Sequence, residues 1–213
     1  MTLPSFISSV QTRLQSELPG LDAQLKMLPI KRKRNIPDEE TLQKARKAAV
    51  CLVIYEKDEK WHTVLIQRTT YEGVHSGQMA FPGGQYEEGD VSLMATALRE
   101  TEEEIGLQRQ DLKTLGTLSK VYIPPSNMLV LPVVAYLDCS PDFVLQDTEV
   151  AKVLEVELTY LGNPIIRTQK QVSVANDLKM MVPCYDVHDH VVWGATAVML
   201  SEWLVIWEEI NGE

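Results

Sequence analysis

The segment from Ser92 to Gly106 restricts the fold more than any other part of this sequence. It begins with a residue whose hydroxyl caps helices and ends with glycine, which readily adopts the left-handed conformation that follows a helix. Between these ends, mainly apolar side chains recur at gaps of four, three and four residues, at Met94, Leu98, Thr101 and Ile105. We therefore predict an amphipathic helix whose apolar stripe faces a core.

The predicted helix carries a dense negative charge. From Glu87 to Glu104 the chain has seven acidic residues and one base, Arg99. Such a cluster is unfavourable unless a cation lies within it. Glu100, Glu103 and Glu104 are spaced i, i+3 and i+4, which predicts one shared face opposite the apolar stripe. Three such carboxylates are oxygen ligands suited to Mg²⁺ or Mn²⁺, and a solvated acidic face is the alternative. Arg99 lies four residues before Glu103 and can form an ion pair with it.

Apolar runs around this helix predict strands. Residues 48–55 and 61–67, joined by a polar turn, predict a hairpin with one buried face. Further strands are expected at residues 115–123, 129–137, 150–158 and 171–182, and an apolar-rich helix at residues 195–210. Strands mixed with a few helices indicate an α/β sandwich.

We interpret residues 1–44 as an N-terminal helical extension and residues 45–213 as one domain. Apolar residues at gaps of three and four predict a helix over residues 5–28, interrupted at Pro19-Gly20. A basic run, Lys-Arg-Lys-Arg at residues 31–34, follows. We interpret it as a solvated linker, with a localisation signal or a phosphate-binding arm as the alternative.

Charge and composition limit the partners. The chain has 30 acidic and 20 basic residues and a formal net charge of −10, which argues against a broad nucleic-acid-binding surface. No apolar run approaches the roughly 20 residues that a membrane helix needs, and the N-terminus lacks the features of a signal peptide. Cys51, Cys139 and Cys184 are far apart and lack metal-type spacing. We therefore expect reduced, mostly buried thiols in a cytoplasmic protein.

Residues 99–107 read Arg-Glu-Thr-Glu-Glu-Glu-Ile-Gly-Leu, and Gly83-Gly84 precedes them. This pattern resembles the Nudix box, whose core is Arg-Glu-x-x-Glu-Glu-x-Gly followed by an apolar residue. Two positions and one spacing depart from the general box. Asp90 replaces a glutamate, eight residues rather than seven separate it from Arg99, and Thr101 replaces an apolar residue.

A second stretch narrows the resemblance. Residues 65–69 (Leu-Ile-Gln-Arg-Thr) and 75–84 (His-Ser-Gly-Gln-Met-Ala-Phe-Pro-Gly-Gly) resemble the signature upstream of the box in coenzyme A pyrophosphatases. That subfamily also tends to have the aspartate and the longer spacing. Residues 192–197 resemble its C-terminal segment, whereas Gly73 stands where the signature often has arginine.

The resemblance implies a Nudix-type α/β/α sandwich with a mixed β-sheet, and a hydrolase that uses Mg²⁺ or Mn²⁺. The implied metal ligands are Glu100, Glu103, Glu104 and the Gly83 carbonyl. The expected general base is Glu103 or Glu149, and we group Arg99 with these catalytic residues. The implied substrate contacts are Arg68, His75 and Gln78.

The implied substrate is coenzyme A or its thioesters, cleaved to adenosine 3′,5′-bisphosphate and 4′-phosphopantetheine or its acyl form. Two alternatives stay open: hydrolysis of another nucleoside-diphosphate derivative, such as a nucleotide sugar or a dinucleotide, and a Nudix-fold binding module without catalysis. Homodimers are common among Nudix proteins, so a homodimer also stays open. We interpret Trp193 as a core or helix-start residue, with stacking on adenine as the alternative.

Overall fold

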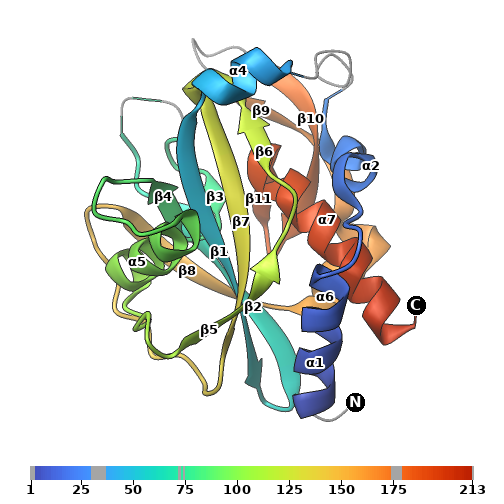
Figure 1. Ribbon diagram of the computed structural model, residues 1–213. Helices are drawn as coiled ribbons and strands as arrows, with labels where there is room; N and C mark the ends of the chain where they lie inside the picture. The colour runs from blue at the N-terminus through green and yellow to red at the C-terminus, as the bar shows by residue number, and fades with distance from the viewer. Residues whose placement is uncertain (1–2, 30–36, 72, 74, 174–178, 213) are drawn as a thin grey trace.

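A mixed β-sheet forms the centre of the molecule, and helices cover both of its faces (Figure 1). The computed structural model describes residues 3–29, 37–71, 73, 75–173 and 179–212, so the basic run at residues 31–34 lies outside the described residues. The helices and 3-10 turns are α1 (Leu3–Leu14), α2 (Gly20–Gln24), η1 (Leu25–Met27), α4 (Glu39–Lys44), α5 (Leu93–Ile105), η2 (Pro124–Ser126), α6 (Leu158–Gly162), η3 (Pro164–Ile166) and α7 (Gly194–Asn211). The strands of the main sheet are β1 (Arg46–Lys57), β2 (Lys60–Arg68), β3 (Met79–Ala80), β4 (Gly83–Gln85), β5 (Leu112–Thr117), β6 (Val121–Ile123), β7 (Met128–Leu137) and β8 (Val150–Glu157).

Strand β1 organises this sheet, because it pairs with neighbours on both sides. It forms the predicted antiparallel hairpin with β2, with Ile54 opposite Thr63. It also runs parallel to β7 along nearly its whole length. Its first half pairs with β4, where Val50 lies opposite Gly83. One parallel pairing among antiparallel ones makes the sheet mixed, as the sequence predicts.

Alternate side chains of β1 enter two separate cores, because successive side chains of a strand point to opposite faces. Leu52 and Ile54 belong to the core under α7 and α1. Cys51 and Val53 belong to the core under α5. Helices therefore cover both faces of the sheet, which confirms the predicted α/β/α sandwich (Figure 1).

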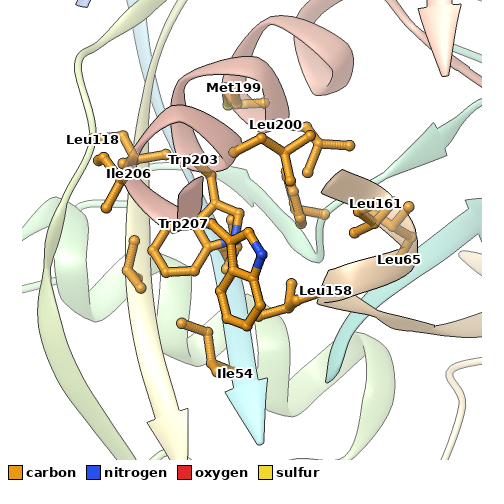
Figure 2. Close-up of a cluster of buried hydrophobic side chains, with 14 of the residues drawn as sticks. Ile54, Leu65, Leu118, Leu158, Leu161, Met199, Leu200, Trp203, Ile206 and Trp207 are labelled. Carbon is orange, nitrogen blue, oxygen red and sulfur yellow. The ribbon is translucent and has the colours of Figure 1, made fainter. Parts of the chain in front are cut away.

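Helix α7 supplies the largest side chains of its core. Trp203 and Trp207, one turn apart, point from α7 toward Ile54 of β1 and Leu158 of α6 (Figure 2). Trp203 is completely buried. This helix covers the sheet face opposite α5, and it confirms the apolar-rich helix predicted over residues 195–210.

The N-terminal extension packs into the same core. Phe6 of α1 is fully buried and its ring lies 4.1 Å from Trp61 and 5.5 Å from Trp207, measured between ring centroids. Farther along, the buried carboxylate of Glu202 in α7 accepts hydrogen bonds from the Gly20 amide at 3.1 Å and the Gln24 carboxamide at 3.0 Å. We propose that the extension is required for stability.

A second, smaller antiparallel sheet consists of β9 (Arg167–Ser173), β10 (Lys179–Val187) and β11 (His190–Trp193), in the order β11-β10-β9. The prediction of one strand over residues 171–182 is wrong, because β9 ends at Ser173 and β10 begins at Lys179. The single strand predicted over residues 115–123 is also divided, into β5 and β6. Both pair with β7, and the register shifts between Thr114 and Gly116.

The capping of α5 is as predicted, and its buried face is predicted in part. Ser92 accepts a hydrogen bond from the Ala95 amide, and Gly106 is left-handed. Thr101 and Ile105 are buried as predicted, whereas Met94, predicted to be buried, is 43% exposed. The buried residues also include Thr96, Ala97 and Glu104, which the predicted stripe lacks. The short side chain of Ala97 contributes to the core against β1, and the Thr101 hydroxyl donates to the Ala97 carbonyl at 2.7 Å.

The structure bears on two sequence-based expectations, one about membrane-spanning helices and one about the cysteines. No helix in the described residues is long and apolar enough to cross a membrane. Cys51 and Cys184 are buried and Cys139 is exposed, and all three are free thiols.

Replacement of Phe6 tests whether α1 is part of the core. Phe6→Ala should lower the free energy of unfolding by about 3–5 kcal/mol, because a fully buried ring is lost and a cavity remains. Urea denaturation followed by tryptophan fluorescence measures this. The control is Leu21→Ala in the same extension, which removes a side chain that is 44% exposed and should cost about 1 kcal/mol or less. Equal effects of the two substitutions would contradict the packing of α1.

Candidate active site

The turn at Gly83 and Gly84 brings the sheet close to helix α5. A Cβ atom on Gly83 would lie 2.4 Å from the Ala49 carbonyl oxygen, and Gly83 has a φ of +151°. A Cβ atom on Gly84 would lie 2.5 Å from the carboxyl carbon of Glu100. Glycine is therefore required at position 83 by the close approach of the β1 backbone, whereas at position 84 a side chain would displace the Glu100 carboxylate.

Glu104 is the most deeply buried carboxylate of this site, with 1% of its surface exposed. Its Oε2 accepts a hydrogen bond from the Gly83 amide at 2.8 Å, and its Oε1 lies 3.5 Å from Nη1 of Arg68. Burial raises the pKa of Glu104 to about 7, although the Gly83 amide and the Arg68 charge act in the opposite direction. The prediction that Glu104 lies opposite the buried stripe is therefore wrong.

Two further carboxylates lie close to Glu104. Burial raises the pKa of Glu100, and the negative charges of Glu103 and Glu149 raise it further. The charge of Glu149 also raises the pKa of Glu104. The loop before β8 carries Glu149 to this position, because the Gln146 amide donates to the Glu104 carbonyl at 3.0 Å. The structure thus brings Glu149 toward the helix carboxylates from a distant part of the sequence.

Arg99 connects the acidic groups around the helix. Its guanidinium donates to both Asp90 oxygens, at 2.9 and 3.1 Å, and to Glu103 at 2.9 Å. It also lies 3.0 Å from Glu100. Hydrogen bonding from Arg99 holds the pKa of Asp90 well below its usual range. The ion pair with Glu103 follows the helical spacing and is confirmed.

Asp90, which the resemblance places in the box, makes contacts that the sequence did not predict. It is buried, and its Oδ2 also accepts a hydrogen bond from the Thr96 hydroxyl at 2.8 Å. Asp90 thereby joins the loop before α5 to the second turn of the helix and orients Arg99. Arg99 follows Asp90 by nine positions, and Asp90 precedes the helix, so the i, i+3 and i, i+4 contacts of a helix do not predict this pair. Only the opposite charges of the two residues indicated a contact.

Glu103 stands apart from the buried carboxylates. Its side chain is 55% exposed and forms an ion pair with Arg99. Among residues 3–29, 37–71, 73, 75–173 and 179–212, no three acidic, histidine or cysteine side chains already form a cage for a metal ion. The donors still fit a hard divalent cation in kind, since the negative charge of Glu149 raises the pKa of both Glu100 and Glu104, and a bound cation would relieve this repulsion. A cage would need Glu103, which is exposed, to rotate inward.

Of the three residues predicted to contact substrate, Arg68 contacts the acidic group and the other two contact each other. Arg68 reaches Glu104, and its Nε is buried without a hydrogen-bond partner among the described residues. The ring of His75 lies 3.2 Å from the Gln78 carboxamide oxygen through Nδ1 and 3.4 Å from the Ser126 hydroxyl through Nε2. His75 and Gln78 thus contact each other, whereas Ser126 was not foreseen.

Comparison with known proteins assigns this site to a family. Residues 45–162 match the model of the NUDIX domain. An uncharacterised Nudix hydrolase, NudL, of Photorhabdus laumondii is 34% identical over 74% of this chain and 82% of its own. NudL of Salmonella paratyphi B is 32% identical over 76% of this chain and 83% of its own. The crystal structure of the Nudix hydrolase RenU of M. smegmatis has a TM-score of 0.52 at 16% identity, covering 79% of this chain and 87% of RenU, and supports the fold.

The raised pKa of Glu104 can be measured directly. In the metal-free protein, carbon-13 NMR of glutamate carboxyl groups should reveal one that titrates near pH 7 and disappears in Glu104→Gln. Because burial favours the neutral form of Glu104, the metal-free protein should also lose stability as the pH rises from 4.5, the ordinary pKa of glutamate, to about 7. A Glu104 resonance that titrates at the ordinary glutamate pKa would contradict the burial of this carboxylate.

Proposed function

This chain belongs to the Nudix hydrolase family, and we propose that it hydrolyses the diphosphate bond of coenzyme A or acyl-CoA with the help of Mg²⁺ or Mn²⁺. The observation that carries the proposal is the contact of Glu100 and Glu104 with the Gly83-Gly84 turn, together with the negative charge of Glu149 that acts on both. Carboxylates gathered in this way favour a bound cation, which an anionic diphosphate needs in a protein of net charge −10.

Nudix hydrolases generally use divalent metal ions. In the proposed site Glu100, Glu103 and Glu104 would hold the ion, with the Gly83 carbonyl as a further ligand. The ion would supply positive charge to the diphosphate oxygens and increase the acidity of water. Glu104 would need to be ionised, so its interaction with Arg68 and the Gly83 amide serves to keep it negative.

The remaining residues supply acid–base chemistry and orientation. Glu103 or Glu149 would accept the proton of the attacking water. Arg99, which Asp90 orients, pairs with Glu103, and Glu103 would turn from this pair toward the ion. The water oxygen would form a new bond to one phosphorus and the bridging P–O bond would break, which leaves one phosphate on each product.

The choice of coenzyme A rests on the sequence signature at residues 65–69 and 75–84. Within that signature, Arg68 is suited to a diphosphate because its guanidinium presents several donors in a plane. Its Nε is a buried donor without a hydrogen-bond partner among the residues that the structure describes. His75 and Gln78, which hydrogen-bond to each other, are the further proposed contacts.

Substitution of two neighbouring glutamates tests the role of Glu103. Glu103→Gln should reduce kcat by about 10²-fold or more, because a ligand or base is lost. The matched control is Glu102→Gln, one residue earlier, whose carboxylate pairs with Arg109 and should leave turnover nearly unchanged. The assay is product release at saturating Mg²⁺. Near-normal turnover by Glu103→Gln would contradict its assignment.

Measurements of kcat and Mn²⁺ affinity in Glu149→Gln test whether Glu149 or Glu103 is the general base. If Glu149 is the base, Glu149→Gln should lower kcat by about 10²-fold or more while Mn²⁺ affinity, measured by calorimetry, changes little. If Glu103 is the base, Glu149→Gln should retain most of its kcat. A large loss of Mn²⁺ affinity in Glu149→Gln would instead assign this residue to the metal site.

The substrate is tested by product analysis. With Mg²⁺ or Mn²⁺, coenzyme A should give adenosine 3′,5′-bisphosphate and 4′-phosphopantetheine faster than ADP-ribose, a nucleotide sugar or a diadenosine polyphosphate is cleaved. Chromatography separates these products. Faster cleavage of one of the other compounds would retain the hydrolase and reject coenzyme A. Failure to cleave any of the four would favour a binding module.

A further inference from the structure

A cavity of about 360 Å³ lies between the two sheets, away from α5. One wall comes from Gln67 of β2 and Gln78 and Met79 at the start of β3. The other wall comes from the small sheet, with Ser173 of β9 and Trp193 of β11. Its volume is near the lower end of the range for small-molecule sites, about 300–1,000 Å³. The cavity therefore suits one ring system better than a whole dinucleotide.

The cavity and the acidic site share the end of strand β2. Leu65 enters the core under α7 and Ile66 enters the core under α5, so side chains alternate between the faces here. Gln67 accordingly lines the cavity, whereas the next residue, Arg68, reaches Glu104. The Arg68 amide also donates to the Gln78 carbonyl at 3.0 Å. One ligand that crosses the end of this strand can thus contact both places.

The cavity walls offer polar groups that the protein itself does not use. Among the described residues, no hydrogen bond joins another residue to the Gln67 carboxamide, the Ser173 hydroxyl or the Trp193 indole nitrogen. Gln78 uses its carboxamide oxygen for His75 and keeps its amide hydrogens available. Unused donors and acceptors around a cavity indicate a polar ligand. A fatty acyl chain, which leaves such groups unpaired, is a poor match.

The indole of Trp193 adds a flat surface to this polar wall. Val192 is fully buried in the core, so Val191 and Trp193 point to the other side of β11, where both line the cavity. An indole beside carboxamides is the combination that recognises a nucleobase, because the ring stacks on the base while glutamine can pair with the edge of adenine.

We propose that this cavity binds the nucleobase of the substrate, a purine, stacked on Trp193 and hydrogen-bonded at its edge by Gln67. The inference rests on the proposed function in one respect, that the substrate is a nucleotide derivative. It gives Trp193 a role in binding and makes the second sheet a part of the active centre. The diphosphate then extends past Arg68 to the carboxylates, while the remainder of the substrate leaves on the other side.

Binding without turnover tests this assignment. Calorimetry in metal-free buffer compares adenosine 5′-monophosphate with ribose 5-phosphate, which lacks the base. Trp193→Ala should bind the nucleotide about tenfold more weakly, with ribose 5-phosphate unaffected, and Trp193→Phe should recover part of the loss. Trp193→Ala should also raise KM for coenzyme A.

Two glutamine substitutions test the same inference in case the tryptophan variant misfolds. Gln67→Ala should weaken nucleotide binding about three- to tenfold, as expected for a lost hydrogen bond. Gln171→Ala is the control, because Gln171 is exposed on β9 outside the cavity. The inference is overturned if the wild-type protein does not bind the nucleotide, if Gln67→Ala and Trp193→Ala bind it as the wild type does, or if ribose 5-phosphate is weakened equally.

Failure of the inference and failure of the proposed function give different results. A protein that leaves coenzyme A intact but binds the nucleotide through Trp193 would reject coenzyme A hydrolysis and support the cavity assignment. A protein that hydrolyses coenzyme A with the same KM in the wild type, Gln67→Ala and Trp193→Ala would retain the function and reject the cavity as the base site.

Discussion

A hydrogen bond from the Gly83 amide to the buried carboxylate of Glu104 joins helix α5 to the central sheet, and the geometry of the acidic site depends on it. The bond forms because Gly83 lacks a side chain and lies directly against β1. It fixes the rotation of α5, and this rotation brings Glu100 against Gly84. Burial makes the charge on Glu104 unfavourable, so the same contact that fixes the fold prepares a place for a cation.

Arg99 offsets the negative charge on the outer side of the acidic site. It is paired to Asp90 and also contacts Glu100 and Glu103, so one guanidinium offsets part of the repulsion among three carboxylates. Among the residues that the structure describes, the cation paired with Glu104 is the more distant Arg68. The site is thus asymmetric. The carboxylates of its outer part are paired with Arg99, whereas the carboxylate of Glu104 in its inner part is less well paired. In the proposed mechanism the inner part attracts the metal ion and the outer part positions Glu103.

The sequence predicts what local rules govern and misses what distant contacts decide. The caps of α5 at Ser92 and Gly106 and the β1–β2 hairpin follow from residue type and spacing alone. The burial of Glu104 does not, because periodicity favours Met94 as an inward residue and gives no sign that Gly83 would satisfy a buried carboxylate. The cavity between Gln67 and Trp193 is missed for the same reason, since it exists only where two sheets meet.

An anomalous difference map from a crystal of this protein grown with Mn²⁺ would locate the metal ion itself. We expect a peak bounded by the carboxylates of Glu100 and Glu104 and the Gly83 carbonyl, with Glu103 rotated toward it. Mn²⁺ bound elsewhere, or a Glu104 carboxylate that stays turned away from the ion, would contradict the claim that the contact between α5 and the Gly83-Gly84 turn forms a metal site.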